Sequence, residues 1–208
     1  TKGTQEPYRM MTSRSEYRLV LRQDNADRRL CPIGHRIGLV SDARLQAVEE
    51  KYAAVEREIR RLTHTGVAGS SALNALLTAR GTAPVADGAR LIDLLRRPQV
   101  SYDDLRPFDP AAPELPGAVR EQVEISVKYE GYIRRQQRQV EDFEQLEKHA
   151  LPDRMDYSAI QGLRLEAREK LDAVRPLNLG QASRISGVSP ADVGALMIWL
   201  QTHRDKEE

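Results

Sequence analysis

The spacing of apolar residues constrains this chain more than any other feature of its sequence. From Ser41 to Leu62, apolar side chains recur at steps of three and four residues, which places them on one face of an α-helix. This stripe consists of Leu45, Val48, Tyr52, Val55, Ile59 and Leu62. No segment shows the alternation of apolar and polar residues that is typical of a β-strand. The sequence therefore predicts an all-α, multi-helical fold.

Capping residues and helix breakers predict the other helices. Ser13 and Glu16 match a capping box, and Ser189 followed by Pro190 matches a second helix start. Pro32 and the glycines after it are expected to end an early helix. We expect helices over residues 13–22, 24–29, 41–62, 71–80, 90–97, 118–149, 164–174 and 179–185, one turn after residue 101, and a last helix from residue 190.

A proline-rich segment predicts the domain boundary. Residues 109–117 contain three prolines and a glycine, which sustain neither a helix nor a central strand. We therefore expect one helical region over residues 1–116 and another over residues 117–208. In the second region, the longest helix is followed by a small helical bundle.

The composition excludes several classes of protein. No apolar run approaches the roughly 20 residues that span a bilayer, and the N-terminus lacks the apolar core of a secretory signal. Cys31 is the single cysteine, so the chain forms no internal disulfide. We expect a cytoplasmic protein without membrane contact. Because the chain starts at Thr1 without an initiator methionine, we also expect it to be a piece of a longer protein.

Sequence patterns of catalysis are missing. The chain has no Gly-rich dinucleotide or phosphate loop, no His-Glu-x-x-His pattern and no cysteine pair. Its four histidines do not have the spacing of metal ligands: His35, His64, His149 and His203. We therefore expect no catalytic residue, metal or cofactor in this chain.

The basic residues favour a binding function instead. The net charge is only +1, so nucleic-acid binding would depend on local patches. Arg14, Arg18 and Arg22 are spaced by four, which lines them along about 12 Å of a helix edge. With Arg9 and Arg28, they form an array that can follow nucleic-acid phosphates. The alternative is internal pairing with Glu16, Asp24 and Asp27.

The expected long helix carries a second candidate surface. Lys128 and Arg134 lie close in sequence to Tyr129 and Tyr132, and basic residues interleaved with aromatic ones can hold an RNA backbone and stack a base. The tyrosines also fall on the apolar stripe of that helix, so the alternative is that they belong to the core.

The last helix is apolar almost all round and must be buried or meet a partner. Val193, Leu196 and Trp199, with Arg184 just before this helix, are candidate partner contacts, and Trp199 is the expected anchor. The alternative is a plain core helix. Residues 183–193 also resemble the turn of a helix-turn-helix, but residues 190–200 carry no side chain suited to reading base edges.

Several blocks, in order, closely resemble the GidA (MnmG) family of tRNA-modifying enzymes. The first is residues 6–19, which read Glu-Pro-Tyr-Arg-Met-Met-Thr-Ser-Arg-Ser-Glu-Tyr-Arg-Leu. The others are residues 22–27, 34–40, 97–105, 128–133 and 178–190. The family usually has phenylalanine in place of Met11 and often alanine in place of Ser15. The resemblance covers nearly the whole chain.

The resemblance implies a function that the residues alone do not. The full enzyme of this family is a homodimer that binds FAD in an N-terminal domain and works with the GTPase MnmE. Together they install a carboxymethylaminomethyl or aminomethyl group on the wobble uridine of certain tRNAs, with methylenetetrahydrofolate as carbon source and NADH as reductant. The family's dinucleotide motif and catalytic cysteines have no counterpart in this chain.

By this resemblance, residues 1–116 contact tRNA beside the FAD domain, and residues 117–208 dock MnmE. The expected tRNA contacts are Arg9, Arg14, Arg18, Arg22, Arg28, Lys128 and Arg134. The expected MnmE contacts are Arg184, Val193, Leu196 and Trp199. The rival functions are a helical scaffold that binds only proteins and, third, a helix-turn-helix DNA-binding regulator.

Overall fold

The structure is a computed structural model that describes residues 17–204 as parts of two compact units. Unit 1 ends at Gln136 and unit 2 begins at Gln137. The sequence predicts the boundary at the proline-rich segment, between residues 116 and 117, whereas the structure has it about 20 residues later. The reason is that the helix following Pro116 packs into the core of unit 1 through Val119, Val123 and other residues.

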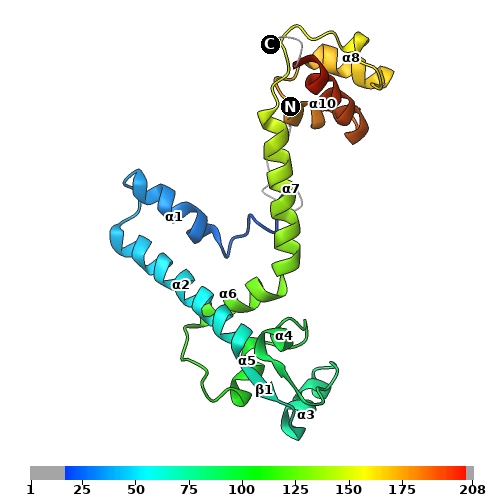
Figure 1. Ribbon diagram of the computed structural model, residues 1–208. Helices are drawn as coiled ribbons and strands as arrows, with labels where there is room; N and C mark the ends of the chain where they lie inside the picture. The colour runs from blue at the N-terminus through cyan, green and yellow to red at the C-terminus, as the bar shows by residue number, and fades with distance from the viewer. Residues whose placement is uncertain (1–16, 205–208) are drawn as a thin grey trace, which may run out of the picture. The chain divides into compact units, whose positions relative to one another are not determined.

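Unit 1 contains most of the secondary structure (Figure 1). Its elements are α1 (Ala26–Arg36), α2 (Asp42–His64), β1 (Gly66–Ala68), α3 (Ser71–Ala79), β2 (Gly88–Arg90), α4 (Leu91–Leu95), α5 (Tyr102–Leu105), the 3₁₀ helix η2 (Arg106–Phe108) and α6 (Gly117–Lys128). Helix α7 (Glu130–Lys148) begins here and continues into unit 2. The all-α, multi-helical fold class predicted from the sequence is confirmed, with one two-stranded sheet beside the helices in the described residues.

Local capping explains where several helices begin. The hydroxyl of Ser41 accepts a hydrogen bond from the backbone N–H of Arg44 at the start of α2. Ser70 caps α3 in the same way. At α5, Ser101 and Asp104 form a reciprocal capping box, with donor to acceptor distances of 3.2 and 2.9 Å. The expected starts of these helices are confirmed because each depends on residues only three positions apart.

Helix α1 differs from the expectation, because it runs through Pro32 to Arg36 instead of ending near Arg29. It pairs with α2, where Asp27 accepts hydrogen bonds from the Tyr52 hydroxyl at 2.7 Å and from Lys51 at 2.8 Å. These contacts offset the backbone hydrogen bond that a proline removes from a helix.

A small antiparallel sheet is the main departure from an all-helical chain. Gly66 pairs with Arg90, and Ala68 pairs with Gly88. Each strand has three residues, which is too short for the sequence alternation that identifies a strand. The sheet joins the end of α2 to the start of α4, and Leu91 N–H donates to Thr65 O at 3.0 Å.

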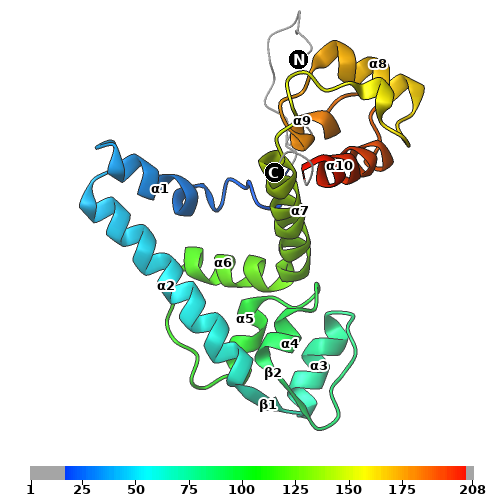
Figure 2. The ribbon, with the colours of Figure 1, turned by 45° about the horizontal axis from the view of Figure 1, so that its top comes forward.

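The core of unit 1 lies between α2, α3, α4 and α6. Figure 2 shows α6 beside α2, with α4 and α5 beneath α6. The fully buried side chains include Leu73, Leu77, Leu91, Leu94, Leu95, Val100 and Val123. Glu58 of α2 is also buried, and its carboxylate accepts hydrogen bonds from the Tyr102 hydroxyl and from Arg61, so its charge is paired.

The long helix expected over residues 118–149 is two helices, α6 and α7, with Tyr129 between them. The buried face of α6 ends with Val127, whereas α7 has no buried residue. Gly131, whose intrinsic helix propensity is poor, follows directly. The chain therefore changes direction where the core ends.

Unit 2 consists of the remainder of α7, the 3₁₀ helix η3 (Tyr157–Ala159), α8 (Leu165–Val174), α9 (Leu179–Ser183) and α10 (Pro190–Arg204). Its core is built from aliphatic side chains of α8, α9 and α10, among them Ala167, Leu171, Leu179, Ala182 and Leu196. Ser189 and Asp192 form reciprocal hydrogen bonds at the start of α10, as the sequence predicts for a helix that begins there.

Candidate nucleic-acid interface

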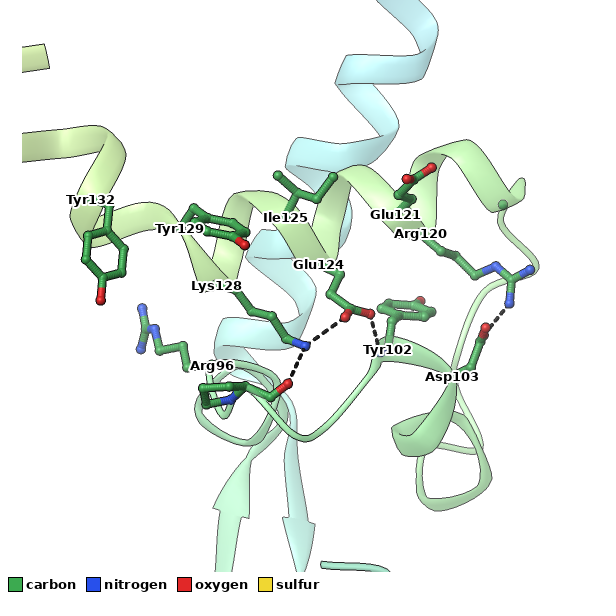
Figure 3. Close-up of a pocket in the computed structure, with 12 residues that line it drawn as sticks. Arg96, Tyr102, Asp103, Arg120, Glu121, Glu124, Ile125, Lys128, Tyr129 and Tyr132 are labelled. Atoms are coloured by element: carbon green, nitrogen blue, oxygen red, sulfur yellow. Dashed lines mark hydrogen bonds and ion pairs between the residues drawn. The ribbon is translucent and has the colours of Figure 1, made fainter. Parts of the chain in front are cut away.

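A groove of about 690 Å³ lies in unit 1 between the loop before α5 and the surface of α6. Figure 3 shows Tyr129 and Tyr132 at one end, and Arg120 with Asp103 at the other. Other residues that line it are Arg96, Pro98, Tyr102, Glu124, Ile125 and Lys128. The break between α6 and α7 places both exposed tyrosines at the groove.

Tyr129 and Tyr132 are not core residues, although the apolar stripe permitted that interpretation. Tyr129 is 47% exposed and Tyr132 is 63% exposed. Their ring centroids lie 6.5 Å apart, with 54° between the ring planes. The two rings therefore form an exposed aromatic pair, which can accept a planar ligand.

Lys128, in the middle of the groove, is paired with groups of the protein itself. Lys128 Nζ lies 2.7 Å from a carboxylate oxygen of Glu124 and also donates to the carbonyl oxygen of Pro98. The other carboxylate oxygen of Glu124 accepts from the backbone N–H of Tyr102 at 2.9 Å. Lys128, a predicted tRNA contact, therefore holds α6 against the loop before α5.

The two arginines of the groove are paired as well. Arg96 contacts Asp93 at 2.8 Å and Glu130 at 3.1 Å. Arg120 is paired with Asp103 (Figure 3). Each cation of this groove thus has a carboxylate partner, so the groove has no unpaired cation for a phosphate.

A second depression of about 590 Å³ adjoins Tyr132 and is lined by Arg134 and Arg135. Arg134, another predicted tRNA contact, is exposed and lies 2.6 Å from Glu130 one helical turn earlier. Arg135 is exposed and has no ion pair with any residue that the structure describes. Arg135 is therefore the cation beside the tyrosine pair that is available to an anion.

The N-terminal arginine array is only partly described. Arg9 and Arg14 lie outside the described residues. Residues 17–20 form a turn, tied to α7 by the Gln136 side chain, which accepts from Leu19 and Val20 N–H. From residue 17 onward the helix expected for this array does not form. A hydrogen bond from Leu21 N–H to Tyr17 O closes a single turn, and the N–H groups of Leu19 and Val20 also donate to Gln136 of α7.

The described arginines of the array differ in their contacts. Arg18 is exposed and forms no ion pair with another described residue. Arg22 is paired with Asp24 at 2.9 Å, and this hydrogen bond holds the pKa of the Asp24 carboxyl below its usual value. Arg28 pairs with Glu56 at 3.0 Å but keeps most of its side chain exposed. Internal pairing, the alternative interpretation, applies to Arg22 and partly to Arg28.

A basic surface on α2 is not among the residues predicted from the sequence. Arg57, Arg60 and His64 are exposed and lie at helical spacing on the side opposite the buried stripe. Arg57 and Arg60 form no ion pair within the described part of the chain. The three- and four-residue spacing of these basic residues is a signal that was present in the sequence.

The predicted partner contacts of unit 2 divide into two groups. Val193 and Leu196 are buried in the core of the unit and present no surface, because their side of α10 packs against α8 and α9. Trp199 is half-buried, and its ring stacks on His203 at 4.1 Å. Arg184 is exposed, pairs with Glu147 and lies over the Phe143 ring.

A hollow of about 420 Å³ in unit 2 adjoins Trp199. Lys148, His149, Leu200 and His203 also line it. Ile198, next to Trp199, is 63% exposed. An apolar surface with basic neighbours is therefore present on the last helix.

The described residues contain no group of three or more histidine, cysteine or carboxylate side chains placed to hold a metal ion. The Cys31 thiol is buried beside α2. No glycine-rich turn joins a strand to a helix in the manner that dinucleotides require, so these residues do not fit FAD. Within residues 17–204, no helix is both long and apolar enough to cross a lipid bilayer.

Comparison with known proteins agrees with these features. Residues 42–137 match the family model of the tRNA modifying enzyme MnmG/GidA C-terminal helical domain, and residues 139–208 match that of the C-terminal helical bundle. The MnmG enzyme of Caldicellulosiruptor saccharolyticus is 53% identical over 201 residues, which are 97% of this chain and 32% of that protein. MnmG of Bacillus subtilis is 50% identical over 98% of this chain and 32% of its own length.

A solved structure is similar as well. Aquifex aeolicus GidA superposes with a TM-score of 0.67 at 37% identity, over 96% of this chain and 31% of that chain. The chain spans about a third of the length of the relatives that it matches.

The two helical units thus define a helical segment of an RNA-modifying enzyme. The chain belongs to the MnmG/GidA family, in which it corresponds to the C-terminal helical domain and the helical bundle.

Proposed function

We propose that this chain binds tRNA and a partner GTPase for a tRNA uridine 5-carboxymethylaminomethyl modification enzyme. Unit 1 binds the tRNA, and unit 2 docks the GTPase MnmE. In a protein of the relatives' full length, the chemistry takes place outside these helices, with FAD, NADH and methylenetetrahydrofolate, and the enzyme is a homodimer.

The unpaired basic face of α2 is the observation on which tRNA binding mainly rests. Arg57 and Arg60 are exposed, and no described carboxylate neutralises them. Each such guanidinium can displace a counterion from a phosphate and add salt-dependent affinity. Arg18 and Arg135 are available in the same way.

Some of the residues predicted from the sequence remain proposed tRNA contacts, and others have a structural role. Arg28 and Arg134 keep exposed guanidinium groups that can exchange a carboxylate for a phosphate, so both stay as tRNA contacts. Arg22 and Lys128 have mostly buried side chains. Arg22 holds Asp24 and the Leu19 carbonyl within its own turn, and Lys128 holds α6 against the loop before α5. Arg9 and Arg14 stay as proposed contacts from their sequence alone.

Docking of the GTPase rests on the exposed end of α10. Ile198 and Trp199 supply apolar surface, and Lys148 with His149 supplies basic groups beside it. Tryptophan is enriched among the residues that dominate interface energies. Arg184 lies in the same unit and remains a proposed contact.

A filter-binding titration of the chain against tRNA and against duplex DNA tests this function. We expect tighter binding to tRNA, with an affinity that falls as salt rises. Preference for the DNA duplex would favour a helix-turn-helix regulator, although α10 offers few groups that read bases. Absence of all nucleic-acid binding would favour a scaffold that binds only proteins.

A further inference from the structure

We infer that the Tyr129–Tyr132 pair is a stacking site for an unpaired RNA base, with Arg135 holding the adjoining phosphate. This inference rests on the proposed binding of tRNA and names the part of the RNA that this groove takes.

Exposure separates this pair from other tyrosines of the chain. Tyr52 and Tyr102 are buried, and their hydroxyls donate to Asp27 and Glu58. The rings of these two core tyrosines are thus buried, and their hydroxyls are hydrogen-bonded. Tyr129 and Tyr132 instead leave about half or more of each side chain in water, side by side. Adjacent exposed aromatic rings of this kind offer a surface on which a planar ligand can stack.

The charges of the groove select the kind of ligand. Lys128, Arg96 and Arg120 each have a carboxylate partner at the groove. A phosphate placed there would have to displace a carboxylate. An uncharged planar group meets no such cost and gains contact with the tyrosine rings and with Ile125. The groove therefore fits a nucleobase better than a phosphate.

Arg135 supplies the complementary charge outside the groove. It lines the second depression together with Tyr132, which lies three residues before it in α7. Because it has no carboxylate partner among the described residues, it can bind the phosphate of a nucleotide whose base lies on the tyrosines. A base on aromatic rings beside an arginine is how proteins hold unpaired RNA.

The geometry of the pair suits one base. The rings are 6.5 Å apart and tilted by 54°, so a base that stacks on one ring meets the edge of the other. Bases inside a duplex offer no free face, so the ligand is a base that is splayed out of a loop or end.

The test uses the whole 208-residue chain and two double variants. Tyr129→Ala with Tyr132→Ala removes the rings, whereas Tyr129→Phe with Tyr132→Phe keeps them. The probes are tRNA, an RNA duplex without unpaired bases, and a six-nucleotide single-stranded RNA that carries 2-aminopurine. Affinity, 2-aminopurine fluorescence and the NMR signals of the tyrosine rings are measured. Thermal unfolding checks that each variant is folded.

We expect the alanine variant to bind tRNA and the hexanucleotide about 5- to 150-fold more weakly, with duplex binding unchanged. The phenylalanine variant should retain binding and quench 2-aminopurine as the native chain does. Arg135→Ala should weaken binding of the hexanucleotide but leave the quenching at saturation intact. A control substitution at exposed Leu165, Leu165→Ala in unit 2, should change nothing.

The outcomes distinguish this inference from the proposed function. If the native chain binds tRNA and the alanine variant binds it equally well, the stacking site is refuted and tRNA binding stands. If tRNA does not bind but the hexanucleotide shifts the ring signals of both tyrosines, the proposed function is refuted and the stacking site stands. If the alanine variant loses only binding to a protein partner, the groove is a protein-docking site and the inference is wrong.

Discussion

Arg164 and Asp192 join the starts of two helices in unit 2, with a guanidinium nitrogen 2.7 Å from a carboxylate oxygen. Asp192 is 1% exposed, yet its carboxylate also accepts hydrogen bonds from Ser189 N–H at 2.8 Å and from the Ser189 hydroxyl at 2.7 Å. Arg164 directly precedes α8, and Ser189 directly precedes α10. One buried charge thus fixes the entry of both helices.

Stability should depend on pH through this carboxylate. The hydrogen bond from Arg164 holds the pKa of Asp192 well below its usual 3.8, and the bonds from Ser189 assist, although burial opposes them. Because the folded pKa is lowered, the charged carboxylate stabilises the fold above about pH 4, and this contribution is lost as pH falls further. We expect Asp192→Asn to lower the free energy of unfolding by about 2 kcal/mol at pH 7.

The difference from the native chain should shrink as the pH falls below about 4, because the native carboxylate then loses its own contribution. Urea unfolding at pH 7 and at pH 3, followed by the fluorescence of Trp199, measures both values. A difference that is the same at both pH values would contradict this role of Asp192.

Unit 1 should be sensitive to the buried Glu58. Glu58→Ala leaves the Tyr102 hydroxyl without its acceptor and removes one of two carboxylates from Arg61. We expect a loss of about 3 kcal/mol, because the buried Tyr102 hydroxyl loses its acceptor and Arg61 keeps only Asp109 as a carboxylate partner. Glu58→Gln keeps an acceptor for Tyr102 and should lose less.

In Glu58→Ala, far-UV circular dichroism should show that the helices of unit 1 unfold at a lower urea concentration than in the native chain. The fluorescence transition of Trp199, which lies in unit 2, should stay where it is in the native chain. A parallel shift of both signals would show that the two units unfold together.

Reversal of charge on α2 should weaken tRNA binding. For Arg57→Glu with Arg60→Glu, we expect at least tenfold lower affinity and a salt slope smaller by about 0.7 to 0.9 for each phosphate that is no longer neutralised. Arg154→Glu with Lys170→Glu makes the same change of charge at exposed positions of unit 2. Equal effects of the two variants in a filter-binding titration would mean that only net charge matters.

Docking of the partner GTPase should depend on Ile198. Its side chain is 63% exposed, so Ile198→Arg should leave thermal unfolding nearly unchanged and weaken association with MnmE by about tenfold or more. Leu165→Arg is the matched control, because Leu165 is 71% exposed on α8. Calorimetric titration measures both, and undiminished association of Ile198→Arg would remove α10 from the interface.

Two glycines with positive φ should differ in their tolerance of alanine. Gly81 has φ 71° and open space around a Cβ, so Gly81→Ala should cost about 1 to 2 kcal/mol of backbone strain. A Cβ at Gly88, with φ 146°, would lie 2.7 Å from the Val67 carbonyl oxygen in the sheet. Gly88→Ala should therefore lower the free energy of unfolding by more than Gly81→Ala, as measured with urea.

The candidate site was only partly predictable from the sequence. The tyrosines and basic residues near Lys128 were identified, because their types and spacing are local. Which of the cations is available was not predictable, since Lys128 meets Glu124 on its own helix but also the Pro98 carbonyl from a distant loop. Exposure of Tyr129 and Tyr132 follows from the end of the core at Val127.

The sequence by itself determined where most helices begin and that helices dominate. Ser41, Ser70 and Ser101 act through hydrogen bonds to residues three positions away, and such contacts form in any helix that starts there. The resemblance of separate blocks also determined the family, because those residues are read directly from the sequence.

Only the tertiary structure decided where helices end and which groups stay free. Helix α1 passes Pro32 because Asp27 and Cys31 pack on α2. The long helix breaks at Tyr129, where the buried face of α6 ends, and α7 contributes no buried residue. Ion pairs such as Arg164–Asp192 join residues far apart in sequence. Their energies depend on burial and distance, which no local pattern of residues specifies.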